Sequence, residues 1–259
     1  MYIDHERADV VFGTLRSALN NKQFPYDEAS TPQDLVGEEI AKFPQIVQAR
    51  YWFYLCMYMR GPVDSNYAAK MLLQILQDEE GAGIFDPSDP RSKDAEVIDQ
   101  VMSKHNFTRL LKDVKKFWVF ASNKLMAEYS SDPREIFTGI ESFDQLEERC
   151  RYKSKTKAGF MGFQKKMVSM LTYFLRDRKL ITLDNFPPPV DFHLMRVMIL
   201  TGVIKLEDHE PRRFRYENSS RLGYDAIESY LLRARSDPIE LGDALWLLSG
   251  NLCSLSVKK

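Results

Sequence analysis

A carboxylate directly before a helix is the first feature of this sequence that could do chemistry. Asp191 ends the proline-rich segment NFPPPVD and precedes an apolar, helix-forming stretch, FHLMRVMILTG. At a helix N-terminus a carboxylate is held by hydrogen bonds from backbone N–H groups. A carboxylate fixed in this way can stabilise positive charge that develops on a sugar, or accept a proton from a nucleophile. The alternative is an ordinary N-cap, which contributes about 1 kcal/mol to stability.

A run of basic residues precedes this carboxylate in the sequence. Between Arg149 and Lys179 there are ten Lys and Arg residues and one acid, Asp177. The whole chain has a net charge of −1 and a pI near 6.5, so any attraction to nucleic acid must come from a local patch. The run predicts a phosphate-binding surface; the alternative is a solvated helix face.

The basic run contains a turn with two glycines, KAGFMGF, in which Gly159 and Gly162 precede a long amphipathic helix predicted over 164–178. Glycines let a backbone approach a phosphate closely, and the following helix directs free N–H groups toward it. Short turns between helices also use glycine for purely structural reasons. Lys165 and Lys166 open the helix, and because neighbouring positions point about 100° apart, only one of them can face a given cleft.

The elements that position these residues are predicted to be almost all helical, with few strands, near 203–217. The aromatic run 50–60 shows no alternation and is predicted as a buried helix, with Trp52 and Trp118 in the core. Ser65, Asp132 and Asp237 are predicted to open helices. The stretch 81–94 is predicted as a loop. The further helical patterns cover 95–103, 106–129, 192–202, 223–235 and 237–249.

Composition limits the class of protein. The 259 residues are 44% hydrophobic and 28% charged, which is ordinary for a soluble globular protein. Cys56, Cys150 and Cys253 are widely spaced and form no CxxC pair, so reduced thiols in a cytoplasmic protein are expected. The N-terminus is not a signal peptide, and no apolar stretch is long enough to span a membrane.

The segment 143–202 closely resembles the catalytic segment of the helix-hairpin-helix base-excision DNA glycosylases. The resemblance consists of a helix, a basic hairpin with two glycines, a helix that begins with Lys-Lys, and a proline loop that ends in Pro-Val-Asp. It is nearest to the archaeal and eukaryotic 8-oxoguanine glycosylase branch. The glycines here are three positions apart, whereas the family has two. The resemblance implies a mainly α fold with two helical lobes, a cleft between them and a helix-hairpin-helix DNA-binding motif. We expect lobes at 1–140 and 141–259.

The resemblance also implies the site residues. Asp191 matches the catalytic aspartate, and Lys166 is preferred as the Schiff-base lysine because the apolar pattern after it aligns best; Lys165 is the alternative nucleophile. Residues expected to contact DNA are Lys157, Gly159, Gly162, Lys165 and His193. The segment 243–253, DALWLLSGNLC, looks like the entry to an iron–sulfur loop. Since only Cys253 is present, no cluster is expected unless the native protein continues further.

The implied reaction begins with extrusion of a nucleotide from double-stranded DNA. Lys166 attacks the sugar C1′, Asp191 accepts the ammonium proton or stabilises oxocarbenium character, and the Schiff base permits β-elimination. The first candidate for the excised base is an 8-oxoguanine-like purine. We expect a monomer with no metal, no organic cofactor and no membrane partner, located in the cytoplasm and on the nucleoid when bound to DNA.

Two alternatives remain open. An N-glycosidase acting on a free modified nucleoside or nucleotide would keep the aspartate without needing a basic hairpin. A non-catalytic DNA-binding module would explain the charge but would leave the rigid Pro-Val-Asp loop without a role.

Overall fold

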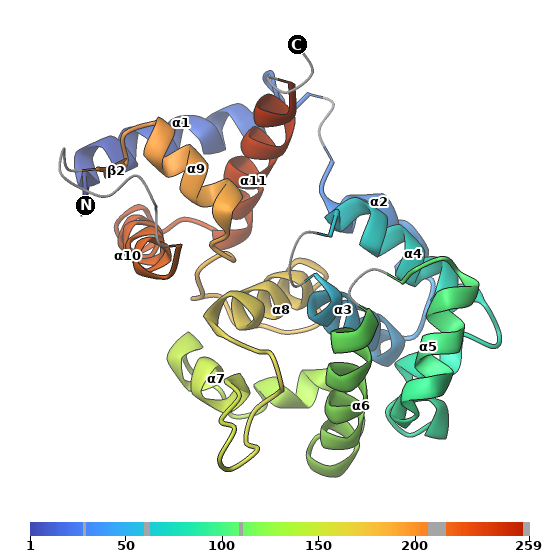
Figure 1. Cartoon of the computed structure of the whole chain (residues 1–259). Helices are drawn as coiled ribbons and strands as arrows, with labels where there is room; N and C mark the ends of the chain where they lie inside the picture. The colour runs from blue at the N-terminus through green and yellow to red at the C-terminus, as the bar shows by residue number, and fades with distance from the viewer. Residues whose placement is uncertain (28–29, 60–62, 109–110, 207–215, 256–259) are drawn as a thin grey trace. The chain divides into compact units, whose positions relative to one another are not determined.

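The computed structural model describes residues 1–27, 30–59, 63–108, 111–206 and 216–255, apart from the side chains of residues 111, 216–219 and 251–255. Within these residues the chain forms eleven α-helices, three short 3₁₀ helices and one two-stranded sheet (Figure 1), which confirms a mainly α fold. No helix in the described part of the chain has the length and apolar character that crossing a membrane requires.

The chain divides into two compact units. One, here called the terminal unit, combines Met1–Thr31 with Asp184–Lys259, and the other, the central unit, is Pro32–Leu183. This division does not follow the boundary near residue 140 expected from the sequence. The reason is that helix α1 (His5–Asn20) packs against the C-terminal helices α10 (Tyr216–Ala234) and α11 (Pro238–Leu255).

Helix α3 (Gln45–Tyr58) is the centre of the central unit, and all its residues from Ala49 to Tyr58 are buried. The ring of Tyr54 stacks on Trp118 with centroids 4.1 Å apart, and the ring of Tyr58 stacks on Phe107 at 4.0 Å. A helix that is apolar on every side must be covered on every side. The buried helix predicted over 50–60 is therefore confirmed as far as Tyr58, while residue 60 lies outside the described residues. Trp52 and Trp118 are both fully buried, as predicted.

The other elements of the central unit cover α3 or connect its neighbours. They are α2 (Pro32–Ile40), α4 (Ser65–Gln77), η1 (Ala82–Phe85), η2 (Pro90–Lys93), α5 (Ala95–Lys104), α6 (Leu111–Glu128), η3 (Pro133–Phe137), α7 (Phe143–Cys150) and α8 (Lys165–Asp177). Helices α4, α6 and α8 all pack on α3. The central unit therefore supports α8, whose first turn carries the two candidate lysines.

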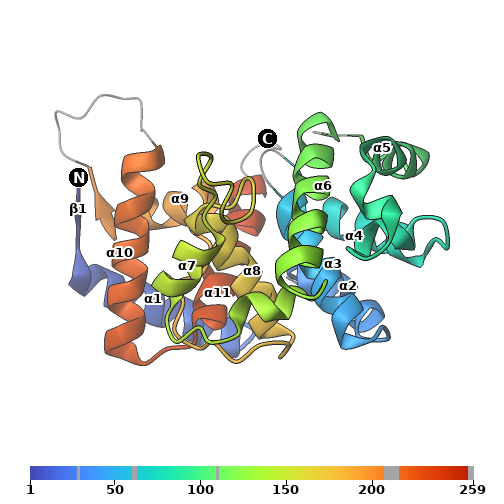
Figure 2. The ribbon, with the colours of Figure 1, turned by 90° about the horizontal axis from the view of Figure 1, so that it is seen from below.

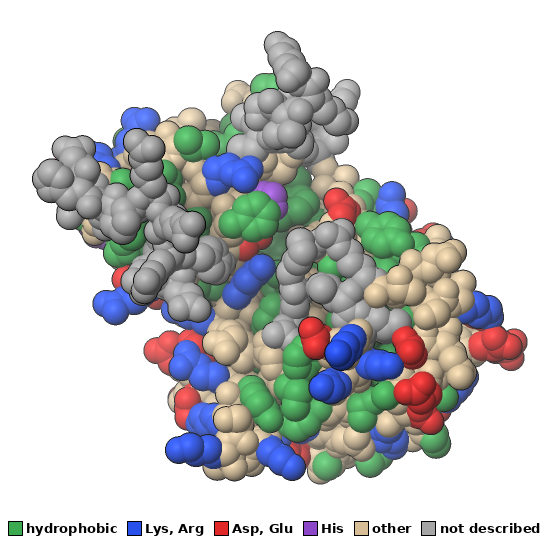
Figure 3. Space-filling view, viewed as in Figure 1, with side chains coloured by type: hydrophobic (Ala, Val, Ile, Leu, Met, Phe, Trp, Pro, Cys, Tyr) green, Lys and Arg blue, Asp and Glu red, His purple; other side chains and the backbone are tan. Residues whose placement is uncertain are grey.

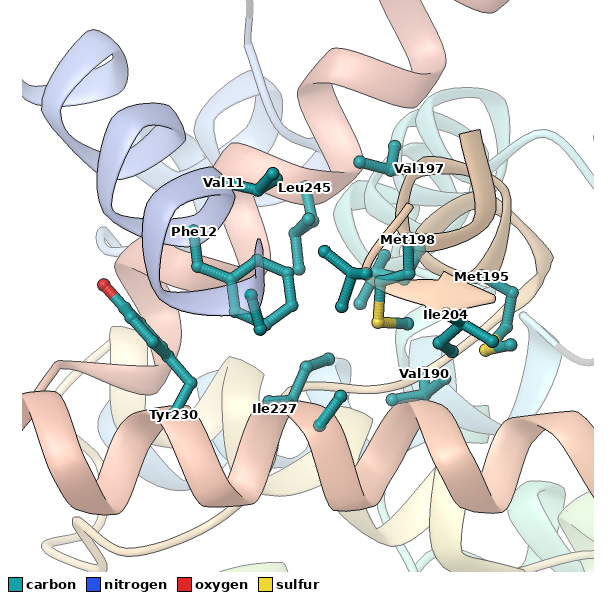
Figure 4. Close-up of a cluster of buried hydrophobic side chains, with 14 of the residues drawn as sticks. Val11, Phe12, Val190, Met195, Val197, Met198, Ile204, Ile227, Tyr230 and Leu245 are labelled. Carbon is teal, nitrogen blue, oxygen red and sulfur yellow. The ribbon is translucent and has the colours of Figure 1, made fainter. Parts of the chain in front are cut away.

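In the terminal unit, helices α1, α9 (Phe192–Leu200), α10 and α11 gather around one apolar cluster (Figures 1 and 2). Figure 4 shows Phe12 of α1, Met198 of α9, Ile227 of α10 and Leu245 of α11 within this cluster. The strands β1 (Tyr2–Ile3) and β2 (Ile204–Lys205) pair antiparallel beside it. This core holds α9 in place and, with it, the candidate carboxylate at the start of α9.

Several local predictions are confirmed and others need correction. Asp132 caps η3 as expected, although the element is a 3₁₀ helix, and the strand β2 lies where strands were predicted. The cap of α4 is Asp64 rather than Ser65, because the Asp64 carboxylate accepts the N–H of Tyr67 at 2.7 Å. The expected loop 81–94 contains the 3₁₀ helices η1 and η2.

Candidate functional site

The predicted site residues fall into two groups, one in each compact unit. Lys157, Gly159, Gly162, Lys165 and Lys166 lie on one continuous segment of the central unit, on the connection from α7 to α8 and on the first turn of α8. Asp191 and His193 lie at the start of α9 in the terminal unit. Each group is described within its own unit.

The two candidate lysines occupy the first turn of α8, and both are half-buried. The amine of Lys165 lies 6.0 Å from the centre of the Phe143 ring, at the start of α7. The cap residue Gln164 makes no side-chain hydrogen bond to the helix, and the first turn contains no acid. Two cations at the positive end of a helix dipole are unfavourable for stability. Helix α8 therefore begins with residues that do not help the helix to form.

Lys166 shares one face of α8 with Ser169 and Tyr173, because residues three and four positions apart are neighbours on a helix surface. Both Ser169 and Tyr173 are buried. The hydroxyl of Tyr173 accepts a hydrogen bond from the Gln33 side chain at 3.2 Å, and Gln33 is itself buried. Among the described residues, the hydroxyl of Ser169 has no hydrogen-bond partner. Buried polar groups without partners are rare, and each requires an explanation.

The connection between α7 and α8 spans residues 151–164 and is called the bridged loop below. Two isolated bridges join Arg151 to Phe160 and Lys153 to Ala158. Phe160 and Phe163 are fully buried, and their rings pack on Phe53 of α3 with centroids 5.3 and 5.5 Å apart. The tip, residues 153–157, is exposed. The loop is longer than the short interhelical turn that the resemblance implies, and its two aromatic anchors hold it on the core.

The two glycines of the bridged loop both have positive φ, +71° at Gly159 and +89° at Gly162. A Cβ at Gly159 would lie 2.1 Å from the carbonyl oxygen of Arg151 and 2.6 Å from that of Cys150. The close backbone approach at Gly159 is therefore to the chain itself, where the loop packs on the end of α7. This packing explains the glycine without a phosphate.

Part of the basic run is paired inside the protein. The guanidinium of Arg149 donates to the carbonyls of Ile136 and Thr138, both at 2.8 Å. Arg151 pairs with Glu147, Lys153 pairs with Glu148, and Arg178 pairs with Asp177 at 2.7 Å. On the face shown in Figure 3, Lys and Arg side chains are interspersed with Asp and Glu. The count of ten bases against one acid thus overstates the local charge, because Glu147 and Glu148 lie just outside the counted segment.

Asp191 is the N-cap of α9, as predicted. Its Oδ1 accepts the N–H groups of His193 at 2.8 Å and Leu194 at 3.1 Å. The preceding Val190 is buried, and its N–H donates to the Tyr224 hydroxyl at 3.2 Å. Among the described residues, no donor is hydrogen-bonded to Oδ2 of Asp191. The carboxylate is therefore fixed through one oxygen, and the other can accept a proton or face a developing positive charge.

His193 is also held in a defined orientation. Its Nδ1 lies 3.0 Å from the hydroxyl of the buried Ser249 on α11, so that the two form a hydrogen bond. The centre of its ring lies 3.9 Å from that of Phe192 and 6.4 Å from that of Trp246. The hydrogen bond at Nδ1 fixes the orientation of the imidazole ring.

The thiol of Cys150 and the possible metal ligands form no further candidate site in the described residues. Burial raises the pKa of the Cys150 thiol to about 12, so this side chain stays protonated and unreactive. The side chain of Cys253 lies outside the described residues. Within the described part of the chain, no group of three or more His, Cys, Asp or Glu residues is arranged to hold a metal ion.

In comparisons with known proteins, no family model, no curated protein and no solved structure matched this chain. Residues that contact the candidate site residues or their helix face, and that the sequence did not single out, are Phe143, Gln33, Tyr173 and Ser249. Tyr173 lies seven positions after Lys166, a spacing that places both on one helix face. Gln33 lies on α2, 140 positions before Tyr173, so no pattern in the sequence could indicate their contact.

Proposed function

We propose that this chain is a DNA glycosylase with β-lyase activity that excises a damaged or modified base, an 8-oxoguanine-like purine being the first candidate. The observation that carries the proposal is the face of α8 that begins with Lys166. It continues through the buried hydroxyl of Ser169, which has no hydrogen-bond partner in the part of the chain that the structure describes, to the Tyr173–Gln33 hydrogen bond. In ligand sites a few convergent polar groups fix the orientation of a polar ligand, and we propose that the polar groups on this face have that role for the base.

Lys166 is the proposed nucleophile, with Lys165 as the alternative. The amine of Lys165 lies against the Phe143 ring, which favours Lys166 for the chemistry and leaves Lys165 to contact a phosphate. The neutral Lys166 amine attacks C1′ of the sugar, and the C1′–N bond breaks as the base departs with the electron pair and gains a proton. Opening of the sugar ring then gives the Schiff base, from which β-elimination cleaves the strand.

Asp191 is the proposed proton acceptor and electrostatic partner in this reaction. With Oδ1 held by two backbone N–H groups, its Oδ2 takes the proton that the Lys166 ammonium loses to become the attacking amine, or stabilises oxocarbenium character on the sugar. Exposed Lys157 at the loop tip, with Gly162, Lys165 and His193, is proposed to contact the DNA backbone. Gly159, which was also expected to contact DNA, is buried against the end of α7 and is left out of this set. No metal or organic cofactor enters this reaction.

Borohydride trapping on duplex DNA tests the proposal. Duplexes that each carry one lesion or modified base are incubated with the protein, and sodium borohydride reduces any Schiff base to a stable adduct. We expect an adduct for at least one base, lost in Lys166→Gln and retained in Lys165→Gln. Lys70→Gln is the matched control, because Lys70 is an exposed lysine of α4 in the same unit.

The same assay separates the alternatives. Duplex binding without any adduct or base release would leave a non-catalytic DNA-binding protein. Base release from nucleosides, without affinity for DNA, would identify an N-glycosidase of modified nucleosides. An adduct that survives in both lysine variants would contradict the assignment of the nucleophile.

A further inference from the structure

An open groove of about 760 Å³ lies in the central unit between α6, the start of α5 and the bridged loop. Its apolar surface includes Val119 and Phe120 of α6 and Met161 of the bridged loop. None of these three residues belongs to the proposed catalytic set. The groove meets the proposed DNA-binding surface at Lys157, which lines it from the loop tip.

The charged residues of the groove favour an anionic ligand. Lys116 and Lys157 are exposed at the groove. Lys124 also lines it, but its amine pairs with Glu128 at 2.6 Å, so these two charges offset each other. Glu128 is the only acid among the lining residues described, and the groove therefore keeps an excess of positive charge.

The apolar part of the groove carries an aromatic ring. Phe120 is half-buried, and its ring meets that of Tyr152, in the bridged loop, edge-on with centroids 5.6 Å apart. The two rings are nearly perpendicular, and a T-shaped contact covers at most one face of either ring. A groove that joins lysines to an aromatic face is the usual design for binding an unpaired nucleic-acid strand, whose phosphates meet the cations and whose bases stack on the ring.

We propose that this groove binds an unpaired segment of the DNA strand, with a base on Phe120 and phosphates on Lys116 and Lys157. A fully paired duplex hides the faces of its bases, so it can use the two lysines but not the ring. The inference rests on the proposed function, since it gives that site a substrate that is locally unpaired beside the extruded base.

Fluorescence anisotropy with a labelled oligothymidylate of about ten nucleotides tests the groove, and a fully paired hairpin is measured alongside. We expect Phe120→Ala and Phe120→Leu each to weaken oligothymidylate binding about tenfold and to change hairpin binding much less. The leucine variant keeps an apolar side chain in the groove, so weaker oligothymidylate binding by this variant is due to the missing aromatic ring. Lys116→Glu should weaken both ligands and reduce the salt dependence. Lys70→Glu, which alters an exposed lysine outside the groove lining, should change neither.

The inference is overturned if the Phe120 variants bind oligothymidylate as well as the unaltered protein does. It is also overturned if Lys116→Glu reduces heparin binding as much as oligothymidylate binding while Phe120→Leu has no effect, since the groove would then bind any polyanion. Melting curves of the two lysine variants and of Phe120→Leu confirm that the fold is kept. The trapping assay is read separately: oligothymidylate binding that depends on Phe120, without any adduct, would support the groove and reject the glycosylase.

Discussion

The two helices that carry the proposed catalytic residues begin in opposite ways. Helix α9 starts at Asp191, whose carboxylate accepts two backbone N–H groups. Helix α8 starts at Gln164, whose side chain makes no cap hydrogen bond to the described residues, and places Lys165 and Lys166 in its first turn. The start of α9 lowers the energy of its helix, whereas the start of α8 raises it. A residue that stabilises its helix needs no functional explanation. Two cations at the start of α8 do not stabilise the helix, so we infer that Lys165 and Lys166 are there for function.

The largest expected effect is a loss of base release when the Asp191 carboxylate is replaced. Asp191→Asn keeps an N-cap side chain of nearly the same capping strength but removes the carboxylate as a proton acceptor. We expect base release in single-turnover assays to fall by a factor of about 10² to 10⁴, with DNA affinity and melting temperature nearly unchanged. If turnover stays within a few-fold of the unaltered protein, Asp191 is only a cap.

A large effect on stability is expected at Gly159. Gly159→Ala puts a side chain at φ +71° and a Cβ within 2.1 Å of a backbone oxygen. Since left-handed strain costs about 1–2 kcal/mol and overpacking about 1–3 kcal/mol more, we expect a loss of about 3 kcal/mol in urea unfolding.

The matched control for Gly159→Ala is Gly202→Ala, at the end of α9. Gly202 has a similar φ of +76°, but a Cβ there meets nothing within 4 Å. The expected loss is therefore the strain alone, about 1 kcal/mol. Equal losses at the two glycines would show that the bridged loop is not packed on the end of α7 as described.

These glycines also show how far the sequence predicts the structure. A positive φ at a turn is a local property, so Gly159, Gly162 and the helix end at Gly202 were foreseeable. The close approach of Gly159 to the chain's own backbone was not foreseeable. It depends on how the bridged loop packs on α7, and the residues next to Gly159 in sequence do not determine that packing. The cap at Asp191 and the helix over 164–178 were predicted for the same reason, because caps and amphipathic periodicity are local.

Contacts between distant segments were not predictable. The strand Tyr2–Ile3 is too short to show a pattern, and its partner Ile204–Lys205 lies about two hundred residues later. The hydrogen bond from Gln33 to Tyr173 spans 140 positions. The pairing of Arg151 with Glu147 is local, but Glu147 lies just before the segment Arg149–Lys179 in which the charges were counted, so it was missed.

A smaller effect on stability is expected from the loss of the cap hydrogen bonds at the start of α9. Asp191→Ala removes the two cap bonds, so we expect a loss of about 1 kcal/mol in unfolding free energy, in addition to the loss of turnover. Asp191→Asn, measured in the same urea titration, should lose much less. A full loss in the asparagine variant would mean that the negative charge, rather than the cap bonds, stabilises the start of α9.

The smallest expected effect is a gain in stability at α8. Gln164 is exposed and has the extended backbone of an N-cap, with φ −131° and ψ 174°. Gln164→Ser adds a hydroxyl that can accept an N–H of the first turn, so we expect a gain of about 0.5 kcal/mol or more. Gln164→Ala is the control and should give no gain. A serine variant no more stable than the alanine variant would remove the contrast between the two helix starts.

The most direct test of the central claim is to locate the trapped adduct in the chain. After borohydride reduction on the best substrate, the protein is digested and the peptide that carries the sugar remnant is sequenced by tandem mass spectrometry. We expect a single modified residue, Lys166. Modification of Lys165 would exchange the roles of the two lysines, and modification elsewhere, or none with any base tested, would contradict the account.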